Sequence, residues 1–288
     1  MEYLKKYAPT IFIVLLYFSA IVIWCFVYLQ ENRNDDLKVV FLDVGQGDSI
    51  YIEAPNGKQM LLDAGSNSAI LSQLSKVMPF GDKSIDVVII TNPDTDHMGG
   101  VVDILQNYKV DMILESGTHS DTVTYRTLSQ LIAQNKIQKK FARKGMRLVL
   151  DNKQNIYFDI LFPDRDVSTW ERNDGSVVGK LVYGTSSFML MGDATKYTEL
   201  LIAYNENPQT LNSQVLKLGH HGSHTSSSLL WLEKVKPEIA IVSAGLNNRY
   251  GHPHKDVIQR LSDLGIAVFG TYEKGAIMFK TNGVKLWQ

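Results

Sequence analysis

Residues 11–29, IFIVLLYFSAIVIWCFVYL, form an uninterrupted apolar segment without a charged side chain. Inside a bilayer every backbone N–H and C=O group must be paired within the protein, so a lone segment of this kind has to be a helix. At about 1.5 Å per residue it matches a hydrocarbon core of about 30 Å. The sequence therefore predicts one transmembrane anchor at 11–29, and the chemistry must lie in the residues after it.

The charges around this segment predict its orientation. Lys5 and Lys6 precede it and ENRNDD follows it, so the positive-inside tendency places residues 1–10 in the cytoplasm and the rest outside the cytoplasmic membrane. A cleaved signal peptide is the alternative, but the apolar segment is long for one and no small-x-small cleavage site follows. We expect an uncleaved, single-pass anchor.

After a short linker, residues 30–37, the pattern predicts one domain over 38–288. Runs such as KVVFLDVG and SIDVVIIT indicate strands, whereas SAILSQLSKVM and KDVIQRLSDLG have helical spacing. Two blocks of strands, each followed by strand-helix units, favour an α/β fold, specifically an αββα sandwich. The net charge of −1 argues against a uniformly basic surface for nucleic acid and leaves a local basic groove open.

Candidate metal ligands share one position in this pattern, because each follows an apolar run predicted to be a strand. The only cysteine is Cys25, so a metal site would have to use histidines and carboxylates, which suit Zn²⁺ and Mn²⁺. A lone D-x-D-H loop is more often an Asp-rich turn, and a helix expected from Gly99 would suit an anionic substrate. The residues that favour a metal site are Asp63, Asn92, Asp94, Asp96, His97, Asp193, His220, His221, His252 and His254.

Five segments carry a resemblance to a known family. They are FLDVGQGDSIYIEAPNGKQMLLDAG, TNPDTDHMGG, RNDGSVVGKLVYGTSSFMLMGD, VLKLGHHGSHTSSS and VSAGLNNRYGHPHKDVIQRL. In this order they resemble the metallo-β-lactamase-fold domain of the ComEC-type DNA internalization (competence) proteins of bacteria. The resemblance implies a dinuclear metal hydrolase fold. Larger family members join this domain to a polytopic membrane channel, whereas this chain resembles a free-standing, single-span version.

The resemblance also implies roles for individual residues. The H-x-H-x-D-H motif of the fold falls on Asn92, Asp94, Asp96 and His97, and Asn92 departs from it because an amide oxygen is a weak, neutral ligand. One or two divalent ions, zinc or manganese, are therefore expected. The implied metal ligands are Asp94, Asp96, His97, Asp193 and His220, with Asn92 as a weak ligand. The implied catalytic residues are Asp96, His97, Asp193, His221 and His252, and the implied supporting or substrate-contacting residues are Asp63, Asn173, Asp174, Ser223 and Arg249.

The function expected from these features is a membrane-anchored, metal-dependent hydrolase. Its substrate would be a phosphodiester, either DNA (including single-stranded DNA) or another phosphorylated polymer, outside the cytoplasmic membrane. A different ester, such as phosphorylcholine esters of cell-surface polymers, is an alternative within the same fold. A catalytically inactive accessory module of a separate DNA-uptake channel is the alternative from another class, and the departure at Asn92 motivates it.

Overall fold

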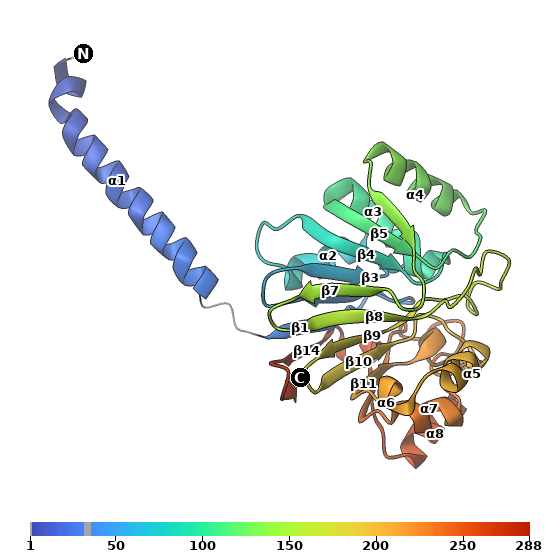
Figure 1. Ribbon diagram of the computed structural model, residues 1–288. Helices are drawn as coiled ribbons and strands as arrows, with labels where there is room; N and C mark the ends of the chain where they lie inside the picture. Colours follow the sequence, from blue (N-terminus) through green and yellow to red (C-terminus); the bar gives the residue numbers. More distant parts are fainter. Residues whose placement is uncertain (1, 32–35) are drawn as a thin grey trace. The chain divides into compact units, whose positions relative to one another are not determined.

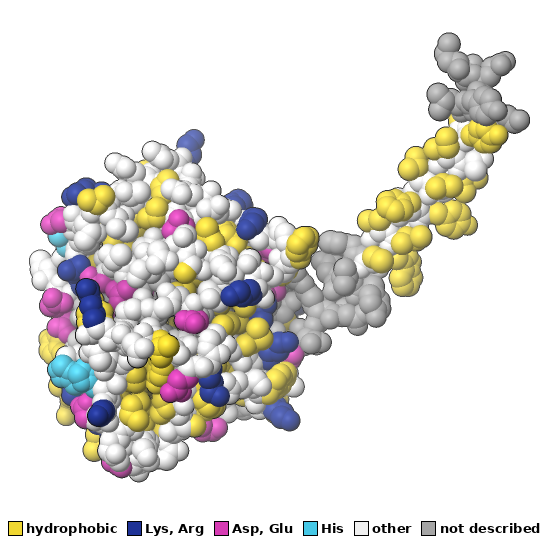
Figure 2. All heavy atoms as spheres, turned by 180° about the vertical axis from the view of Figure 1, so that it is seen from behind, with side chains coloured by type: hydrophobic (Ala, Val, Ile, Leu, Met, Phe, Trp, Pro, Cys, Tyr) yellow, Lys and Arg dark blue, Asp and Glu magenta, His cyan; other side chains and the backbone are white. Residues whose placement is uncertain are grey.

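The computed structural model describes residues 2–31 and 36–288, which fall into an N-terminal helix and a compact domain that spans Asp36–Gln288. Helix α1 covers Glu2–Glu31, and its segment Tyr7–Cys25 is long and apolar enough to cross a membrane. Large apolar side chains along this segment are exposed in the protein (Figure 2). The segment overlaps the predicted span 11–29. Residues 32–35 of the predicted linker lie outside the described residues.

Two mixed β-sheets form the centre of the domain. In the eight-stranded sheet the order is β15-β14-β1-β2-β3-β4-β5-β6, and in the seven-stranded sheet it is β13-β12-β11-β10-β9-β8-β7. The first sheet consists of β1 (Leu37–Phe41), β2 (Ile50–Glu53), β3 (Gln59–Leu62), β4 (Ser84–Ile90), β5 (Lys109–Glu115), β6 (Gln138–Phe141), β14 (Ile277–Thr281) and β15 (Leu286–Trp287). The second consists of β7 (Arg147–Asp151), β8 (Ile156–Phe162), β9 (Val178–Tyr183), β10 (Ser186–Leu190), β11 (Val215–Lys217), β12 (Ile239–Val242) and β13 (Ala267–Gly270).

Helices cover the outer face of each sheet (Figure 1). The first sheet is covered by α2 (Ala69–Val77), α3 (Thr95–Asn107) and α4 (Val123–Gln134). The second is covered by α5 (Lys196–Asn205), α6 (Pro208–Leu211), α7 (Leu229–Val235), α8 (Lys255–Asp263) and α9 (Thr271–Lys274). A 3₁₀ turn, η1, spans Gly219–Gly222. This arrangement confirms the predicted αββα sandwich.

Strand β1 shows why its sequence is apolar throughout. Successive side chains of a strand point to opposite faces of a sheet. Val39 and Phe41 accordingly pack into the core between the two sheets, whereas Val40 and Leu42 pack against the outer helices. A strand buried on both faces reads as a continuous apolar run instead of an alternating one.

The structure differs from the sequence prediction at the C-terminus. Strand β14 is not among the elements expected from the sequence, yet it pairs antiparallel with β1, with Phe279 opposite Val39. The aromatic ring of Phe279 also contacts Phe41 at a centroid distance of 6.1 Å. This pairing joins the two ends of the domain and depends on a register that local sequence does not reveal.

Helix α3 begins four residues earlier than expected, at Thr95 instead of Gly99. Its first turn therefore contains Asp96 and His97. The two glycines that follow permit close packing: a Cβ atom on Gly99 would lie 2.2 Å from the carbonyl oxygen of Ser66, and one on Gly100 would lie 2.1 Å from that of Ala64. The glycine pair thus holds the first turn of α3 against the loop that follows β3.

Candidate metal centre

The predicted site residues follow the carboxyl ends of strands that run parallel within each sheet. Strands β3 and β4 deliver Asp63 and the segment 92–97, β10 and β11 deliver Asp193 and the turn 219–222, and β12 leads into the loop 245–254. Because parallel strands end at the same edge of a sheet, side chains far apart in sequence meet there. One site collects residues from both sheets.

His97 lies between two carboxylates and is fully buried. Its Nδ1 atom is 2.8 Å from Oδ2 of Asp63, and its Nε2 atom is 3.0 Å from Oδ2 of Asp193. Asp63 is itself held by Thr91, whose backbone N–H and hydroxyl donate to its two oxygens. With a metal ion bound, a proton kept on Nδ1 and shared with Asp63 would leave the Nε2 lone pair directed at the ion.

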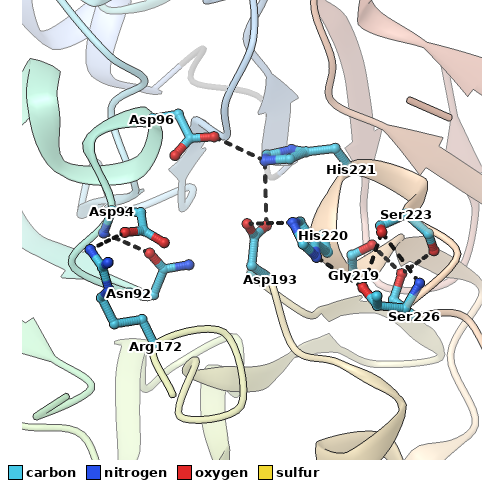
Figure 3. A network of polar contacts seen from close by, with 12 residues as sticks. Asn92, Asp94, Asp96, Arg172, Asp193, Gly219, His220, His221, Ser223 and Ser226 are labelled. Atoms are coloured by element: carbon cyan, nitrogen blue, oxygen red, sulfur yellow. Dashed lines mark hydrogen bonds and ion pairs between the residues drawn. The ribbon is translucent and has the colours of Figure 1, made fainter. Parts of the chain in front are cut away.

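His221 repeats this arrangement from the second sheet. Its Nδ1 atom lies 2.9 Å from the carbonyl oxygen of Ser243 and 3.1 Å from Oδ1 of Asp48. On the other side of the ring, Nε2 is 3.3 Å from Oδ2 of Asp96 and 3.5 Å from Oδ1 of Asp193. His221 therefore reaches the carboxylates of the site directly (Figure 3).

His220, which the resemblance implies as the ligand, lies farther out. Its Nε2 atom is 4.0 Å from Oδ2 of Asp193, and its Nδ1 atom is 3.0 Å from the hydroxyl of Thr225. Both His220 and His221 have left-handed backbone angles, with φ of 46° and 54°, which cost about 1–3 kcal/mol each in residues with a side chain. This turn directs the second histidine of the pair, not the first, to Asp96.

A buried ion pair lies on the Nδ1 side of the His221 ring. It was not predicted from the sequence. The side chains of Lys217 and Asp48 are 0% and 2% exposed and form a salt bridge, and Lys217 Nζ also donates to the carbonyl oxygen of Gly192 at 3.0 Å. The signal was a lysine in the otherwise apolar run VLKLG, because a lysine in a buried strand requires an acidic partner.

The unpaired atoms at the centre of the site fit a divalent metal ion. The ligand atoms of Asp96, His97 and His221 all lie within 4.8 Å of one another. Among the described residues, Nε2 of His97, Nε2 of His221 and Oδ1 of Asp193 are buried and make no well-aligned hydrogen bond, although the two nitrogens lie 3.0 and 3.5 Å from oxygens of Asp193. Buried polar atoms without a partner are rare because they are costly. Two imidazole nitrogens beside two carboxylates form a donor set that zinc and manganese accept.

The charges in the metal-free site support this interpretation. Burial by itself would lower the pKa of His97, but Asp193 and Asp63 raise it well above its ordinary value. Burial likewise opposes protonation of His221, yet Asp193 and Asp48 raise its pKa to about 9. Protons on the imidazoles thus balance the carboxylates, and a metal ion has to displace those protons when it binds.

Asn92 and Asp94 make contacts of their own on the other side of the site. The Oδ1 atom of Asn92 accepts the backbone N–H of Asp94 at 2.8 Å, and the carboxylate of Asp94 forms an ion pair with Arg172. The structure thus gives Asn92 a backbone contact where the resemblance implies a weak metal contact, and it adds Arg172, which the sequence analysis did not select.

A cavity of about 380 Å³ lies over these groups, and Asp94, Asp96, Asn173, Asp193, His220, His221, Arg249, Tyr250 and His252 are among its lining residues. At its rim the guanidinium of Arg249 lies 4.8 Å from the ring centroid of Tyr250, and Tyr250 stacks on His252 at 5.7 Å. Burial and the neighbouring His221 and His220 lower the pKa of His252 to about 4. His252 is therefore neutral at pH 7.

Asp174 and Ser223, which were predicted to support the site or contact substrate, make hydrogen bonds within loops. The carboxylate of Asp174 accepts the hydroxyl of Thr195, which caps α5. The hydroxyl of Ser223 accepts the backbone N–H of Thr225 at 3.3 Å. Both residues hold the loops around the cavity in place.

Several known proteins are similar to this chain over most of its length. ComE operon protein 3 of Bacillus subtilis is 31% identical over 271 residues, which is 88% of this chain and 34% of that protein. Recombination protein 2 of Haemophilus influenzae is 31% identical over 265 residues, 89% of this chain and 31% of that protein. Competence protein ComA of Neisseria gonorrhoeae is 29% identical over 249 residues, 85% of this chain and 32% of that protein. The chain spans about a third of the length of these relatives.

A solved structure and a family model agree with this result. A mutant of CmlA beta-hydroxylase shares the fold with a TM-score of 0.54 and 11% sequence identity, over 86% of this chain and 54% of that one. The model of the Metallo-beta-lactamase superfamily matches residues 42–245. The chain belongs to the Metallo-beta-lactamase superfamily, as a domain whose relatives include competence proteins.

Proposed function

We propose that the chain is a membrane-anchored, metal-dependent phosphodiesterase that cleaves DNA, particularly single-stranded DNA, or another phosphorylated polymer. The observation that carries this proposal is the set of buried ligand atoms of His97, His221 and Asp193 that converge under a cavity with Arg249 at its rim. The ligand atoms suit a divalent ion, and a guanidinium at the rim suits an anionic substrate.

In this proposal Asp96, His97, Asp193 and His221 hold one zinc or manganese ion. The ion would polarise a phosphoryl oxygen and lower the pKa of water so that a nucleophile exists at neutral pH. The protein positions the reactants: Asp63 fixes the ring of His97, and the carbonyl oxygen of Ser243 fixes that of His221. Arg249 would bind phosphate oxygens.

The names of the relatives favour DNA as the polymer. Competence protein ComA and Recombination protein 2 have names that refer to DNA uptake and recombination. The chain spans about a third of their length, and we propose that it cooperates with a DNA-uptake channel. The hydrolase domain, residues 38–288, would lie outside the cytoplasmic membrane.

Turnover by the full chain in detergent tests this function. We expect the metal-free protein to be inactive, and Zn²⁺ or Mn²⁺ to raise hydrolysis of single-stranded DNA and bis-p-nitrophenyl phosphate roughly 100-fold or more. Asp96→Asn, which keeps the size of the side chain but removes its charge, should lose this gain. Preference for p-nitrophenyl phosphorylcholine over both phosphodiesters would favour the alternative ester substrate.

An inactive binding module is the second candidate, and the Asp94–Arg172 ion pair is the observation that favours it. A module of this kind would bind an oligonucleotide in a fluorescence anisotropy titration with and without metal. Any residual turnover of such a module would be unchanged in Asp96→Asn. Metal-dependent cleavage that Asp96→Asn abolishes would exclude it.

Orientation is tested by a reporter fused after Gln288 in a bacterial host. With the N-terminus inside and one helix across the membrane, alkaline phosphatase at the C-terminus should be active and a cytoplasmic β-galactosidase reporter inactive. Moving Lys5 and Lys6 from the N-terminus to positions after residue 31 should reverse the two signals. Activity of the β-galactosidase fusion in the original chain would contradict the proposed placement outside.

A further inference from the structure

Asn92, Asp94 and Arg172 form a separate group that faces Asp193 across the site (Figure 3). Asn92 is completely buried, and Asp94 and Asn173, the residue after Arg172, line the cavity together with Asp193. In the resemblance described above, Asn92 and Asp94 are at the place where the fold holds the first of two metal ions. The contacts of this group decide whether an ion fits there.

The group does not offer a second divalent ion a suitable set of donors. Its amide oxygen already accepts the N–H of Asp94 at 2.8 Å, and the other end of the Asn92 amide is a donor, which repels cations. The carboxylate of Asp94 is paired with the guanidinium of Arg172. The guanidinium is a permanent positive charge on the carboxylate of Asp94, and it would repel a dication bound to the same carboxylate.

We propose that the guanidinium of Arg172 takes the place of a second metal ion, so that the site binds one ion and uses Arg172 to hold a non-bridging phosphate oxygen of the substrate. The part of this inference that concerns the substrate rests on the proposed phosphodiesterase function. The part that concerns the number of ions does not. Arg172 is a positioning residue for Asp94 and a binding residue for the phosphate.

The geometry of Arg172 suits this task. Its Nη1 atom contacts Oδ1 of Asp94, and its side chain remains 40% exposed. A guanidinium has five N–H donors in one plane, so contact with one carboxylate oxygen leaves donors for a second acceptor. It keeps its charge at every physiological pH and matches the oxygens of a phosphate. Arg249 and Asn173, the residue after Arg172, line the same cavity, so an anion bound there would lie between the two loops that carry these arginines.

Counting bound ions tests the first half of the proposal without any activity measurement. The full chain in detergent is loaded with Mn²⁺ or Zn²⁺, freed of excess metal and analysed by mass spectrometry of the metal. We expect one ion per chain in the original protein and in the control Arg165→Ala, which removes an exposed arginine paired with Asp164. The double variant Asn92→His with Arg172→Ala should bind two.

Two ions in the original protein would overturn this half, because Arg172 would then not exclude the second. One ion in the double variant would overturn it as well, since removal of the arginine and restoration of an imidazole would not have recreated a site. Circular dichroism of the double variant establishes that it is folded before ions are counted.

Binding and kinetics test the second half. In metal-free protein, Arg172→Ala should weaken binding of a single-stranded oligothymidylate roughly ten-fold in fluorescence anisotropy, whereas Arg165→Ala should not. With metal, Arg172→Ala should lower kcat/KM for bis-p-nitrophenyl phosphate roughly 10- to 100-fold. Arg172→Lys should recover part of the lost kcat/KM, because the lysine ammonium restores the positive charge but not the planar set of donors. Unchanged oligonucleotide affinity together with unchanged kcat/KM would overturn the role of Arg172 as a phosphate ligand.

The two proposals fail separately. If the original protein cleaves no phosphodiester with either metal, the proposed function fails, while the ion count and the oligonucleotide titration still decide the role of Arg172. If cleavage is robust, the double variant still binds one ion and Arg172→Ala leaves the substrate affinity unchanged, the inference about Arg172 fails and the phosphodiesterase remains.

Discussion

Replacing Asp193 by alanine is expected to remove both metal binding and hydrolysis, with a loss of roughly 100-fold or more in metal affinity and about 1,000-fold in kcat/KM. Asp193 contacts both imidazoles of the site, at 3.0 Å from Nε2 of His97 and 3.5 Å from Nε2 of His221. Its two oxygens therefore reach two ligands from different sheets. Without this carboxylate the site would lose the negative charge that contacts both of its imidazoles.

Asp193 also has the electrostatic character that a metal ligand needs. Burial by itself raises the pKa of a carboxyl group, but His221 and His97 lower the pKa of Asp193 well below its ordinary value. It is therefore ionised throughout the neutral range, and a divalent ion meets a carboxylate that has no proton to release.

The measurement is isothermal titration of Zn²⁺ and Mn²⁺ into the metal-free chain, followed by kinetics on bis-p-nitrophenyl phosphate. Asp159→Asn is the matched control, because Asp159 lies in β8 of the same sheet and pairs with Arg147 at the surface. The control should keep the affinity and rate of the original protein. Undiminished metal affinity in Asp193→Ala would show that the ion is held elsewhere.

The fold was predictable because its signals are local. Apolar runs of strand length alternate with helically spaced segments, and this alternation suffices for an αββα sandwich. The strand ends were equally visible, so the sequence placed Asp63, Asp96, His97 and Asp193 in the region where the structure brings them together. The C-terminal strand β14 was missed because its place beside β1 depends on a contact between the two ends of the domain.

The choice between His220 and His221 could not be made from spacing. Consecutive residues point in different directions, and which one reaches the site depends on the left-handed angles that both adopt. These angles are unusual for residues with a side chain, so propensity gave no indication of them. Only the turn in three dimensions shows that His221 approaches Asp96.

The ion pairs could not be predicted from the sequence for a related reason. Arg172 and Asp94 are far apart in the chain, as are Lys217 and Asp48, and their pairing depends on how the two sheets stack. A lysine within VLKLG indicates that some acid must be near it, but the sequence does not identify Asp48 as that acid. Identification of a buried partner requires the packing of the whole domain.

That packing makes Lys217 the residue with the largest expected effect on stability. Lys217→Met should reduce the free energy of unfolding by about 3–5 kcal/mol, because it leaves the buried carboxylate of Asp48 without its ion-pair partner. For a chain of this size the loss corresponds to a fall of roughly 10 °C in Tm, measured by calorimetry on the metal-free protein. Arg165→Ala, which breaks a surface pair, should leave Tm unchanged.

The double variant Asp48→Asn with Lys217→Met separates charge from packing. If the cost of the single change comes from an unpaired buried charge, removal of that charge should restore most of the lost stability. If the stem of Lys217 mainly fills buried space against one face of the sheet, the double variant should be no more stable than the single one. Since Asp48 also lies 3.1 Å from Nδ1 of His221, the double variant should recover stability more fully than metal affinity, which would connect the buried pair to the orientation of a metal ligand.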